Sequence, residues 1–261
     1  MVADAVAKPR FRVRGVPVLM YHGISQSGGT PDKYWLPLAG LREQLALMRE
    51  DGWRSISLAE LGSTRNALSV VLTFDDGNAS DYECTFPALR ANKLSATFFV
   101  NTANVGAAGY LDWPQMREML AAGMSFGSHG HHHTDMRRVG TQAGDDLVRS
   151  RQILEQKLGC AIEAFSAPYG SINRRLARLA RAAGFRYVCG SHNWLATGSD
   201  RVIPRLAIYR HMQTEDFRRL VAGDRTLLLR RVICERTLAL PKWVLRRVSP
   251  EHSSVHAREG A

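Results

Sequence analysis

The chain has 261 residues, of which 45% are hydrophobic and 23% charged, and its formal net charge at pH 7 is +11. This balance is typical of a globular protein and excludes a disordered or fibrous chain. The positive charge favours an anionic partner such as a phospholipid surface, a pyrophosphate-linked sugar or nucleic acid. Because the sequence contains no recognisable nucleic-acid motif, we expect no specific nucleic-acid partner.

The sequence also bears on the cellular compartment. The four cysteines lie far apart and form no C-x-x-C pair, which is typical of isolated thiols in a reducing compartment. Residues 1–14 lack the continuous apolar run of a signal peptide. No stretch reaches the roughly 18 apolar residues that a membrane span needs. We therefore expect a cytoplasmic protein.

Apolar segments typical of strands alternate with segments of helical periodicity along most of the chain. The strand-like segments are residues 16–20, 54–57, 69–74, 95–100, 124–128, 164–167, 185–189 and 202–208. The helical segments are residues 38–50, 79–91, 113–122, 140–158 and 172–183. This alternation predicts a parallel sheet covered by helices, and periodicity alone does not separate a barrel from an open sheet.

The end of the chain differs in character, because apolar and basic residues are mixed from residue 223 onward. Such a segment could lie on the inner face of a membrane as a peripheral contact. It could equally be a helix that packs on the barrel and presents its arginines to water. We divide the chain into a basic N-terminal arm (1–15), an α/β domain (16–222) and a basic amphipathic tail (223–261). The oligomeric state stays unknown.

Polar side chains follow four of the predicted strands. The clusters are Tyr21-His22, Asp75-Asp76-Gly77, His129 to His133, and Pro168-Tyr169-Gly170. In α/β barrels the loops that leave the carboxyl ends of the strands converge on one face. The four clusters are therefore expected at one mouth.

Two of these clusters have the composition of a metal site. His129 and His133 are four residues apart, which on one helical turn would place both imidazoles on the same side, with residues 131–132 pointing elsewhere. Asp75 and Asp76 offer an oxygen ligand, and their mutual repulsion needs a cation or hydrogen bonds to compensate it. The alternative interpretations are a surface histidine loop and an ordinary Asp-Gly turn.

Three motifs occur together in an informative order. They are Thr73-Phe74-Asp75-Asp76-Gly77, the His129-x-x-x-His133 pair, and Phe165-Ser166-Ala167-Pro168-Tyr169-Gly170. In this order and spacing the chain resembles the polysaccharide deacetylase family, carbohydrate esterase family four, with its nodulation-type chitooligosaccharide deacetylase homology domain. Val18 to His22 resembles the first strand of members that act on exopolysaccharides. The resemblance covers about residues 16–220 and implies a distorted (β/α) barrel with about seven parallel strands.

The resemblance also implies roles for individual residues. Asp76, His129 and His133 would bind a divalent metal, for which Zn²⁺ is favoured, and Asp75 would act as general base. Three protein ligands leave a position for water, whose pKa the ion lowers, so that a nearby carboxylate can accept its proton during attack on an acetamide. The backbone N–H of Tyr169 would stabilise the oxyanion.

The chain departs from the family pattern at two points. Many members carry an arginine before the Pro-Tyr pair, where this chain has Ser166, so Arg205 is our candidate to clamp Asp75 in a bidentate contact. The Leu-x-His motif of the family's acid is absent in clear form. The candidate acids are His211, His22 and His192, and His211 best matches the late position of the family's acid. The candidate substrate-binding residues are Tyr21, His22, Trp113, Trp194 and Pro168.

The expected activity is hydrolytic removal of an N-acetyl group from an amino sugar in a glycan or a lipid-linked glycan precursor. Two alternatives stay open. The same metal site could act on an O-acetyl ester or another amide, because water activation suits all of these substrates. The chain could also be a degenerate homologue that binds glycan without turnover.

Overall fold

The computed structural model of the protein describes residues 14–26, 32–64, 68–138, 140, 142–170 and 172–238. Within them the main sheet has eight strands, namely β1 (Val18–Tyr21), β4 (Arg54–Ser55), β5 (Ser69–Phe74), β6 (Thr97–Val100), β7 (Ser125–Ser128), β8 (Ala164–Ser166), β9 (Tyr187–Cys189) and β10 (Leu206–Ala207). Seven follow the order β10-β1-β5-β6-β7-β8-β9, and β4 pairs with β5. Neighbours along this path are parallel. The predicted α/β barrel-type sheet of about seven parallel strands is confirmed.

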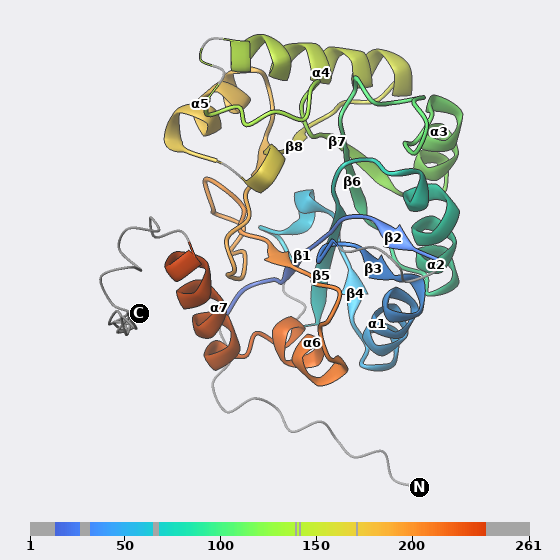
Figure 1. The fold of residues 1–261 in the computed structure, drawn as a ribbon, viewed down its shortest axis with the longest axis vertical. Helices are drawn as coiled ribbons and strands as arrows, with labels where there is room; N and C mark the ends of the chain where they lie inside the picture. Colours follow the sequence, from blue (N-terminus) through green and yellow to red (C-terminus); the bar gives the residue numbers. More distant parts are fainter. Residues whose placement is uncertain are drawn as a thin grey trace, which may run out of the picture.

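The helices cover the outside of this curled sheet, as Figure 1 shows. Their bounds are α1 (Leu38–Glu50), α2 (Phe86–Ala91), α3 (Trp113–Ala121), α4 (Gln142–Leu158), α5 (Arg174–Ala182), α6 (Thr214–Val221) and α7 (Arg225–Leu238). Short helical turns are η1 (Leu58–Glu60), η2 (Asp81–Thr85) and η3 (Pro168–Gly170). A separate parallel pair is formed by β2 (Ile24–Ser25) and β3 (Leu36–Pro37). Helix α1 and strand β5 begin and end where the sequence predicts.

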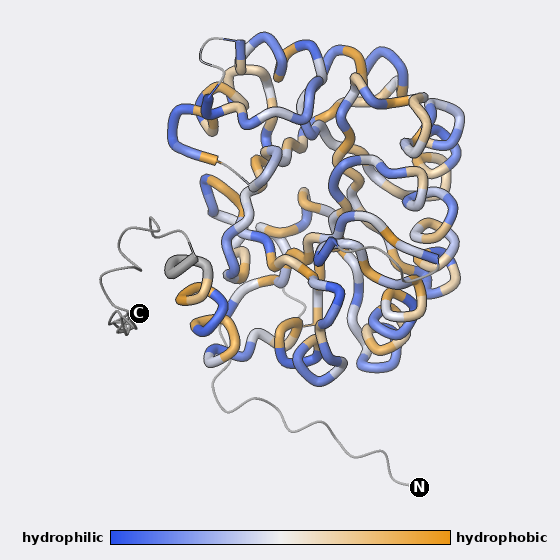
Figure 2. Tube along the Cα trace, in the orientation of Figure 1, coloured by the Kyte–Doolittle hydropathy of each residue, from blue (hydrophilic) through white to orange (hydrophobic). Residues whose placement is uncertain are grey.

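The two faces of the sheet bury different groups of side chains. Leu19 and Leu72 lie in a large cluster together with helix residues such as Leu41. Val18 and Val71, the alternate residues of the same two strands, lie in a smaller cluster. Because successive side chains of a strand point to opposite faces, continuous apolar strands fill both sides. Figure 2 shows hydrophobic and hydrophilic residues alternating along the helices that surround the sheet.

Two elements differ from their predicted bounds for local reasons. Residues 79–91 were expected to form one helix, but the structure has a π-helical turn, η2, followed by α2. Pro87 lacks the N–H that a regular α-helix would use at this point, and the backbone amide of Phe86 donates to the carbonyl oxygen of Asp81, five residues earlier. Strand β10 is shorter than the predicted 202–208, because Pro204 cannot donate to a ladder. Helix α6 was not predicted.

The beginning of the predicted tail packs on the barrel. In α7, Leu228 is fully buried and Leu227 is partly buried against the large cluster, whereas Leu229 and Ile233 are exposed. The described part of the tail therefore resembles the packed helix more than a membrane-surface segment. Residues 239–261, and residues 1–13 of the predicted arm, lie outside the described residues. Among the described helices, none has the length and apolar character that crossing a bilayer requires.

Candidate metal centre

The predicted polar clusters meet at the carboxyl ends of neighbouring strands. Asp75 and Asp76 follow β5, His129 follows β7, and Ser166 is the last residue of β8. His22 follows β1, which lies on the other side of β5. The order of the strands in the sheet, rather than their order in the chain, brings these side chains together.

The three predicted metal ligands converge. Asp76 Oδ1 lies 3.4 Å from His129 Nε2 and 3.3 Å from His133 Nε2. One candidate ligand atom from each of the three residues falls within 4.8 Å of the others. Ligands about 2.1 Å from one ion in a tetrahedral arrangement would themselves be about 3.4 Å apart. The spacing therefore fits three ligands of a shared ion.

The buried oxygen of Asp76 supports the same interpretation. Asp76 Oδ1 has no hydrogen-bond partner within the described residues, although both imidazoles are close. Short distances without hydrogen-bond geometry are expected when three ligands point at a common centre rather than at one another. Asp76 also has φ 81, a left-handed conformation that costs energy in a residue other than glycine. The backbone of the turn after β5 is thus strained at the residue that carries this carboxylate.

The local structure of the histidine pair differs from our expectation. Residues 129–133 form a loop after β7 rather than a helical turn. Gly130 has φ 85, and a Cβ there would lie 2.4 Å from Met136 Cε. The carboxylate of Asp146 in α4 accepts hydrogen bonds from the backbone amides of His131 (2.6 Å) and His132 (3.1 Å). A clamped loop, instead of helical spacing, brings His129 and His133 together.

A backbone carbonyl orients the buried imidazole of His129. His129 is 2% exposed, and its Nδ1 lies 2.9 Å from the carbonyl oxygen of Ser166. A neutral imidazole that donates from Nδ1 presents the lone pair of Nε2 to a metal. His131 and His132 make other contacts, with Thr102 and Asp146 respectively. They point away from the cluster, as predicted.

Asp75 forms a buried bidentate ion pair with Arg205. Arg205 Nη1 lies 2.7 Å from Asp75 Oδ1, and Arg205 Nη2 lies 2.7 Å from Asp75 Oδ2. Both side chains are almost fully buried. Burial by itself would raise the pKa of Asp75, but the guanidinium of Arg205 outweighs it and the pKa is lowered. Asp75 is therefore held as a carboxylate.

The predicted replacement for the family arginine thus lies where it was expected. Strand β10 pairs with β1 at the edge of the sheet, and Arg205, the residue before β10, reaches Asp75 at the end of β5. The hydroxyl of Ser166 accepts a hydrogen bond from Arg205 (2.7 Å) and donates one to Asp75 (3.2 Å). Arg205 also donates to Thr73 (3.1 Å) and to the carbonyl of Gly190 (2.9 Å). Ser166 thus forms hydrogen bonds with both members of the ion pair, and Arg205 supplies the positive charge.

The histidines considered as acids lie in different places. Burial lowers the pKa of His22, and the nearby carboxylates of Asp75 and Asp76 offset this only in part. His211 is exposed in the turn after β10, where its carbonyl accepts a hydrogen bond from Gln213 (3.4 Å). His192 is also exposed. This placement favours His22 over His211, which was our preference, because His22 follows β1 beside β5 and interacts with the carboxylates of Asp75 and Asp76.

The predicted substrate-binding residues are divided between the centre and the core. Tyr21 is 1% exposed, donates to Gln44 (2.9 Å) and stacks on Phe74, so its predicted contact with substrate is wrong. Strand β1 extends one residue beyond the predicted segment, and Tyr21 consequently joins Leu19 in the core. Of the three further candidates, Pro168 is buried, whereas Trp113 and Trp194 are partly buried and pack against the large cluster.

Tyr169 borders the metal cluster through its side chain. Its ring centroid lies 4.6 Å from that of His133, and its hydroxyl donates to the carbonyl of His133 at 3.4 Å. The side chain is 66% exposed, and φ is 60. The phenol of Tyr169 is therefore exposed beside His133.

Sequence reasoning missed a second buried carboxyl group near the centre. Asp81 is 0% exposed, and neither of its side-chain oxygens has a hydrogen-bond partner within the described residues. Burial raises the pKa of Asp81 well above its ordinary value, and the charges of Asp76 and Asp75 raise it further. The sequence did offer one signal for this group, because Asp81 is an acidic residue that lies five positions after Asp76 in a segment expected to be helical.

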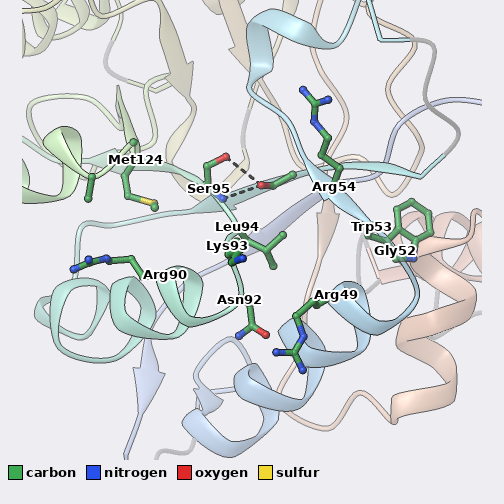
Figure 3. A pocket seen from close by; sticks show the side chains of 13 residues that line it. Arg49, Gly52, Trp53, Arg54, Arg90, Asn92, Lys93, Leu94, Ser95 and Met124 are labelled. Atoms are coloured by element: carbon green, nitrogen blue, oxygen red, sulfur yellow. Dashed lines mark hydrogen bonds between the residues drawn. The ribbon is translucent and has the colours of Figure 1, made fainter.

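A basic hollow of about 660 Å³ lies at the other end of the strands, where β4 begins and helices α1, α2 and α3 end (Figure 3). Its cationic lining residues are Arg49, Arg54, Arg90 and Lys93. Arg49 and Arg90 occupy the last turns of α1 and α2, where cations stabilise the negative end of the helix dipole. The charges of Arg49 and Arg90 therefore have a structural reason, and the hollow contains none of the candidate metal ligands.

The comparisons with known proteins agree with this geometry. Residues 62–188 match the family model described as "Polysaccharide deacetylase". The putative polysaccharide deacetylase YxkH of Bacillus subtilis (strain 168) is 23% identical over 178 residues, covering 66% of this chain and 62% of the relative. The poly-beta-1,6-N-acetyl-D-glucosamine N-deacetylase of Escherichia coli (strain K12) is 24% identical over 254 residues, covering 78% and 38%. The chain thus spans less than two thirds of these curated relatives.

Solved structures show the same fold. The Streptococcus pyogenes deacetylase PplD in complex with acetate has a TM-score of 0.74 at 23% identity, covering 81% of this chain and 99% of that one. IcaB from Ammonifex degensii has a TM-score of 0.67 at 24% identity, covering 82% and 98%. The matched segment contains Asp75, Asp76, His129 and His133. Residues 62–188 therefore match the polysaccharide deacetylase family, and the solved deacetylases share the fold around this segment.

Proposed function

We propose that this protein is a metal-dependent hydrolase that removes an N-acetyl group from an amino sugar in a glycan or lipid-linked glycan precursor. The observation that carries the proposal is the convergence of Asp76, His129 and His133 beside a carboxylate, Asp75, that Arg205 keeps ionised. The curated relatives named as poly-beta-1,6-N-acetyl-D-glucosamine N-deacetylases support the substrate class.

The chemistry of the ligands supports zinc or a similar first-row ion. Two imidazole nitrogens and one carboxylate oxygen suit such ions, and three protein ligands leave room for solvent. When bound, the ion would lower the pKa of a water molecule and polarise the acetamide carbonyl.

Asp75 carries the proton in this proposal. Its carboxylate accepts a proton from the attacking water and then donates it to the nitrogen of the leaving amine, so water is consumed and acetic acid and a free amine form, which ionise to acetate and an ammonium group at neutral pH. Arg205 makes Asp75 a weaker base, and it makes the protonated carboxyl a better acid for the second step. One carboxyl group can thus serve both steps without a separate acid.

His22 has a different role in the proposal. Because burial lowers its pKa, the imidazole of His22 is neutral near pH 7 and is a poor proton donor there. A neutral ring can still position the substrate through a hydrogen bond. The backbone N–H of Tyr169 remains our candidate to stabilise the oxyanion, at the turn where φ is positive.

The test is acetate release from an oligomer of β-1,6-linked N-acetylglucosamine by the metal-loaded protein. We expect release to stop after chelation and to return when Zn²⁺ is added. Asp75→Asn should bind metal as the wild type does and should lose about 10²-fold or more in rate. Release that is indifferent to the chelator would contradict the proposal. Release only from an O-acetyl ester would replace the amide by an ester as substrate.

A further inference from the structure

Helix α7 carries apolar side chains on two of its sides. Leu228 is fully buried in the large cluster, so this side packs on the barrel. Leu229 and Ile233 point elsewhere, and they are 41% and 58% exposed. Residues four apart lie on the same side of a helix. The helix therefore presents apolar surface to the outside as well as to the core.

This outer apolar pair has no explanation in the packing of the barrel. A surface helix normally buries one apolar stripe and is polar elsewhere, and a helix that is apolar all round is normally covered on both sides. A single exposed apolar residue, such as Val148 of α4, is common on any protein surface. In Figure 1, α7 lies at the edge of the molecule beside α6. Its outer side is thus positioned to meet a partner.

The charges around the apolar pair are positive. Arg225 and Arg230 are exposed, and residues 225–234 contain no aspartate or glutamate. Neither arginine forms a salt bridge with a carboxylate of the described residues, whereas Arg219 of the neighbouring α6 is paired with Asp224 at 3.0 Å. The outer side of α7 therefore combines apolar surface with positive charge that no described carboxylate balances.

The charge of the chain distinguishes between the possible partners of this surface. A second copy would bring another formal net charge of +11, and residues 239–261 of the same chain contain four lysines or arginines against two glutamates. Both would place positive charge against the arginines of α7. Nucleic acid would match the charge but not the apolar pair. An anionic lipid surface suits both, because it attracts arginines and accepts apolar side chains between its headgroups.

We propose that the outer side of α7, formed by Arg225, Leu229, Arg230 and Ile233, docks on the surface of a bilayer that contains anionic phospholipids. The helix lies along this surface, and its inner side stays packed on the barrel. This arrangement needs no membrane span, and none of the described helices is suited to be one. The docking goes beyond the proposed function and does not depend on it.

Docking through α7 also has a consequence for the substrate, which does rest on the proposed function. A pocket of about 540 Å³ is lined by residues of α7 and by Tyr169. The ring of Tyr169 lies 4.6 Å from that of His133. A docked α7 would therefore keep the candidate metal centre close to the bilayer, where a lipid-linked glycan precursor is held.

The test is sedimentation of the full chain with vesicles at physiological ionic strength. The vesicles contain either phosphatidylcholine alone or an equal mixture of phosphatidylcholine and phosphatidylglycerol. We expect the anionic vesicles to be bound about 10-fold or more tightly than the neutral ones, because two arginines at an anionic surface contribute about this much. Leu229→Gln combined with Ile233→Gln should weaken binding to the anionic vesicles about 10-fold, since apolar side chains no longer enter the lipid. Arg225→Gln combined with Arg230→Gln should weaken it by a similar factor.

Two matched controls come from other helices. Val148→Gln removes an apolar side chain of α4 that is 41% exposed, as Leu229 is. Arg174→Gln combined with Arg178→Gln removes two exposed arginines four residues apart on α5. Both controls should bind the anionic vesicles as the wild type does. All the substituted side chains face solvent, so each variant should keep the Tm of the wild type, and the α7 variants should release acetate from a water-soluble substrate at the rate of the wild type.

Three results would overturn the proposal. The first is equal binding to neutral and anionic vesicles, or none to either. The second is an equal loss in the α7 variants and their controls, which would assign binding to the overall charge. The third is a dimer in sedimentation velocity that Leu229→Gln combined with Ile233→Gln dissociates, which would assign the surface to a second copy. Failure of the proposed function differs from all three, because it shows as no acetate from any substrate and leaves the vesicle result unchanged.

Discussion

At the scale of single residues, the protein holds two neighbouring buried carboxyl groups in opposite states of protonation. Asp75 stays ionised because Arg205 binds both of its oxygens, whereas Asp81 has no such partner within the described residues and burial raises its pKa. Both groups are fully buried within the same short stretch of chain. The difference in partner, not in burial, separates them.

Removing the guanidinium of Arg205 should reverse the pH dependence that Asp75 contributes to stability. In the wild type the lowered pKa of Asp75 adds stability above about pH 4, and this is lost as pH falls through the folded-state value. In Arg205→Gln burial would raise that pKa, so stability should fall as pH rises above about 4. We expect a loss of about 3–5 kcal/mol at pH 8, as for a broken buried ion pair.

The measurement is urea unfolding of the metal-free proteins at pH 4 and pH 8. The gap between wild type and Arg205→Gln should be wider at pH 8. Ser166→Ala, which leaves the ion pair intact, is the control and should cost only about 1–2 kcal/mol. A gap that does not change with pH would show that Asp75 and Arg205 are not coupled as described.

Asp81→Asn should become more stable relative to the wild type as pH rises, whereas Arg205→Gln should become less stable. A raised pKa means that the folded state keeps a proton that the unfolded chain releases above about pH 4, so Asp81 costs stability as pH rises. Asparagine removes this cost. The advantage of the variant should grow by up to about 1.4 kcal/mol per pH unit above pH 4. Unfolding free energies that differ by the same amount at pH 4 and pH 7 would contradict a neutral Asp81.

At the scale of elements, the loop after β7 depends on a helix that supplies no ligand. Asp146 of α4 binds the backbone amides of His131 and His132, and thereby sets the path of the chain between the two candidate ligand histidines. Asp146→Ala should therefore weaken zinc affinity by about 10–100-fold, as for other groups that support metal ligands. Competition with a chromogenic chelator would measure this. The exposed neighbour Asp145→Ala should bind zinc normally, and an equal loss in both would assign the effect to α4 as a whole.

The elements also show which parts of the structure could be predicted from sequence. Buried parallel strands are continuous apolar runs, so β5 and the alternation around it were predictable. The sequence predicted that His129 and His133 lie together, but for the wrong local structure, because a loop held by Asp146 replaces the expected helical turn. The contact of Arg205 with Asp75 joins residues 130 positions apart, and the sequence offered it only as a candidate. The pairing of β10 with β1 makes it possible.

At the scale of the whole molecule, the barrel places candidate metal ligands from two strand ends near a pocket that α7 helps to form. Ligand residues so far apart in sequence do not form a site in the unfolded chain. Metal binding should therefore stabilise the fold. This coupling makes thermal unfolding a test of the site that needs no substrate.

Zinc at about 100 times its dissociation constant should stabilise the wild type by about 2.7 kcal/mol, which would raise the Tm by several degrees. His133→Ala should lose most of this gain, whereas the exposed His211→Ala should keep it. The gain should also shrink as the pH falls, because burial alone would lower the pKa of His129 but the carboxylates of Asp75 and Asp76 outweigh it and raise that pKa, so that the ion must displace a proton from this imidazole. Differential scanning calorimetry with and without zinc measures all three effects. An equal zinc-induced shift in His133→Ala and the wild type would remove His133 from the metal centre.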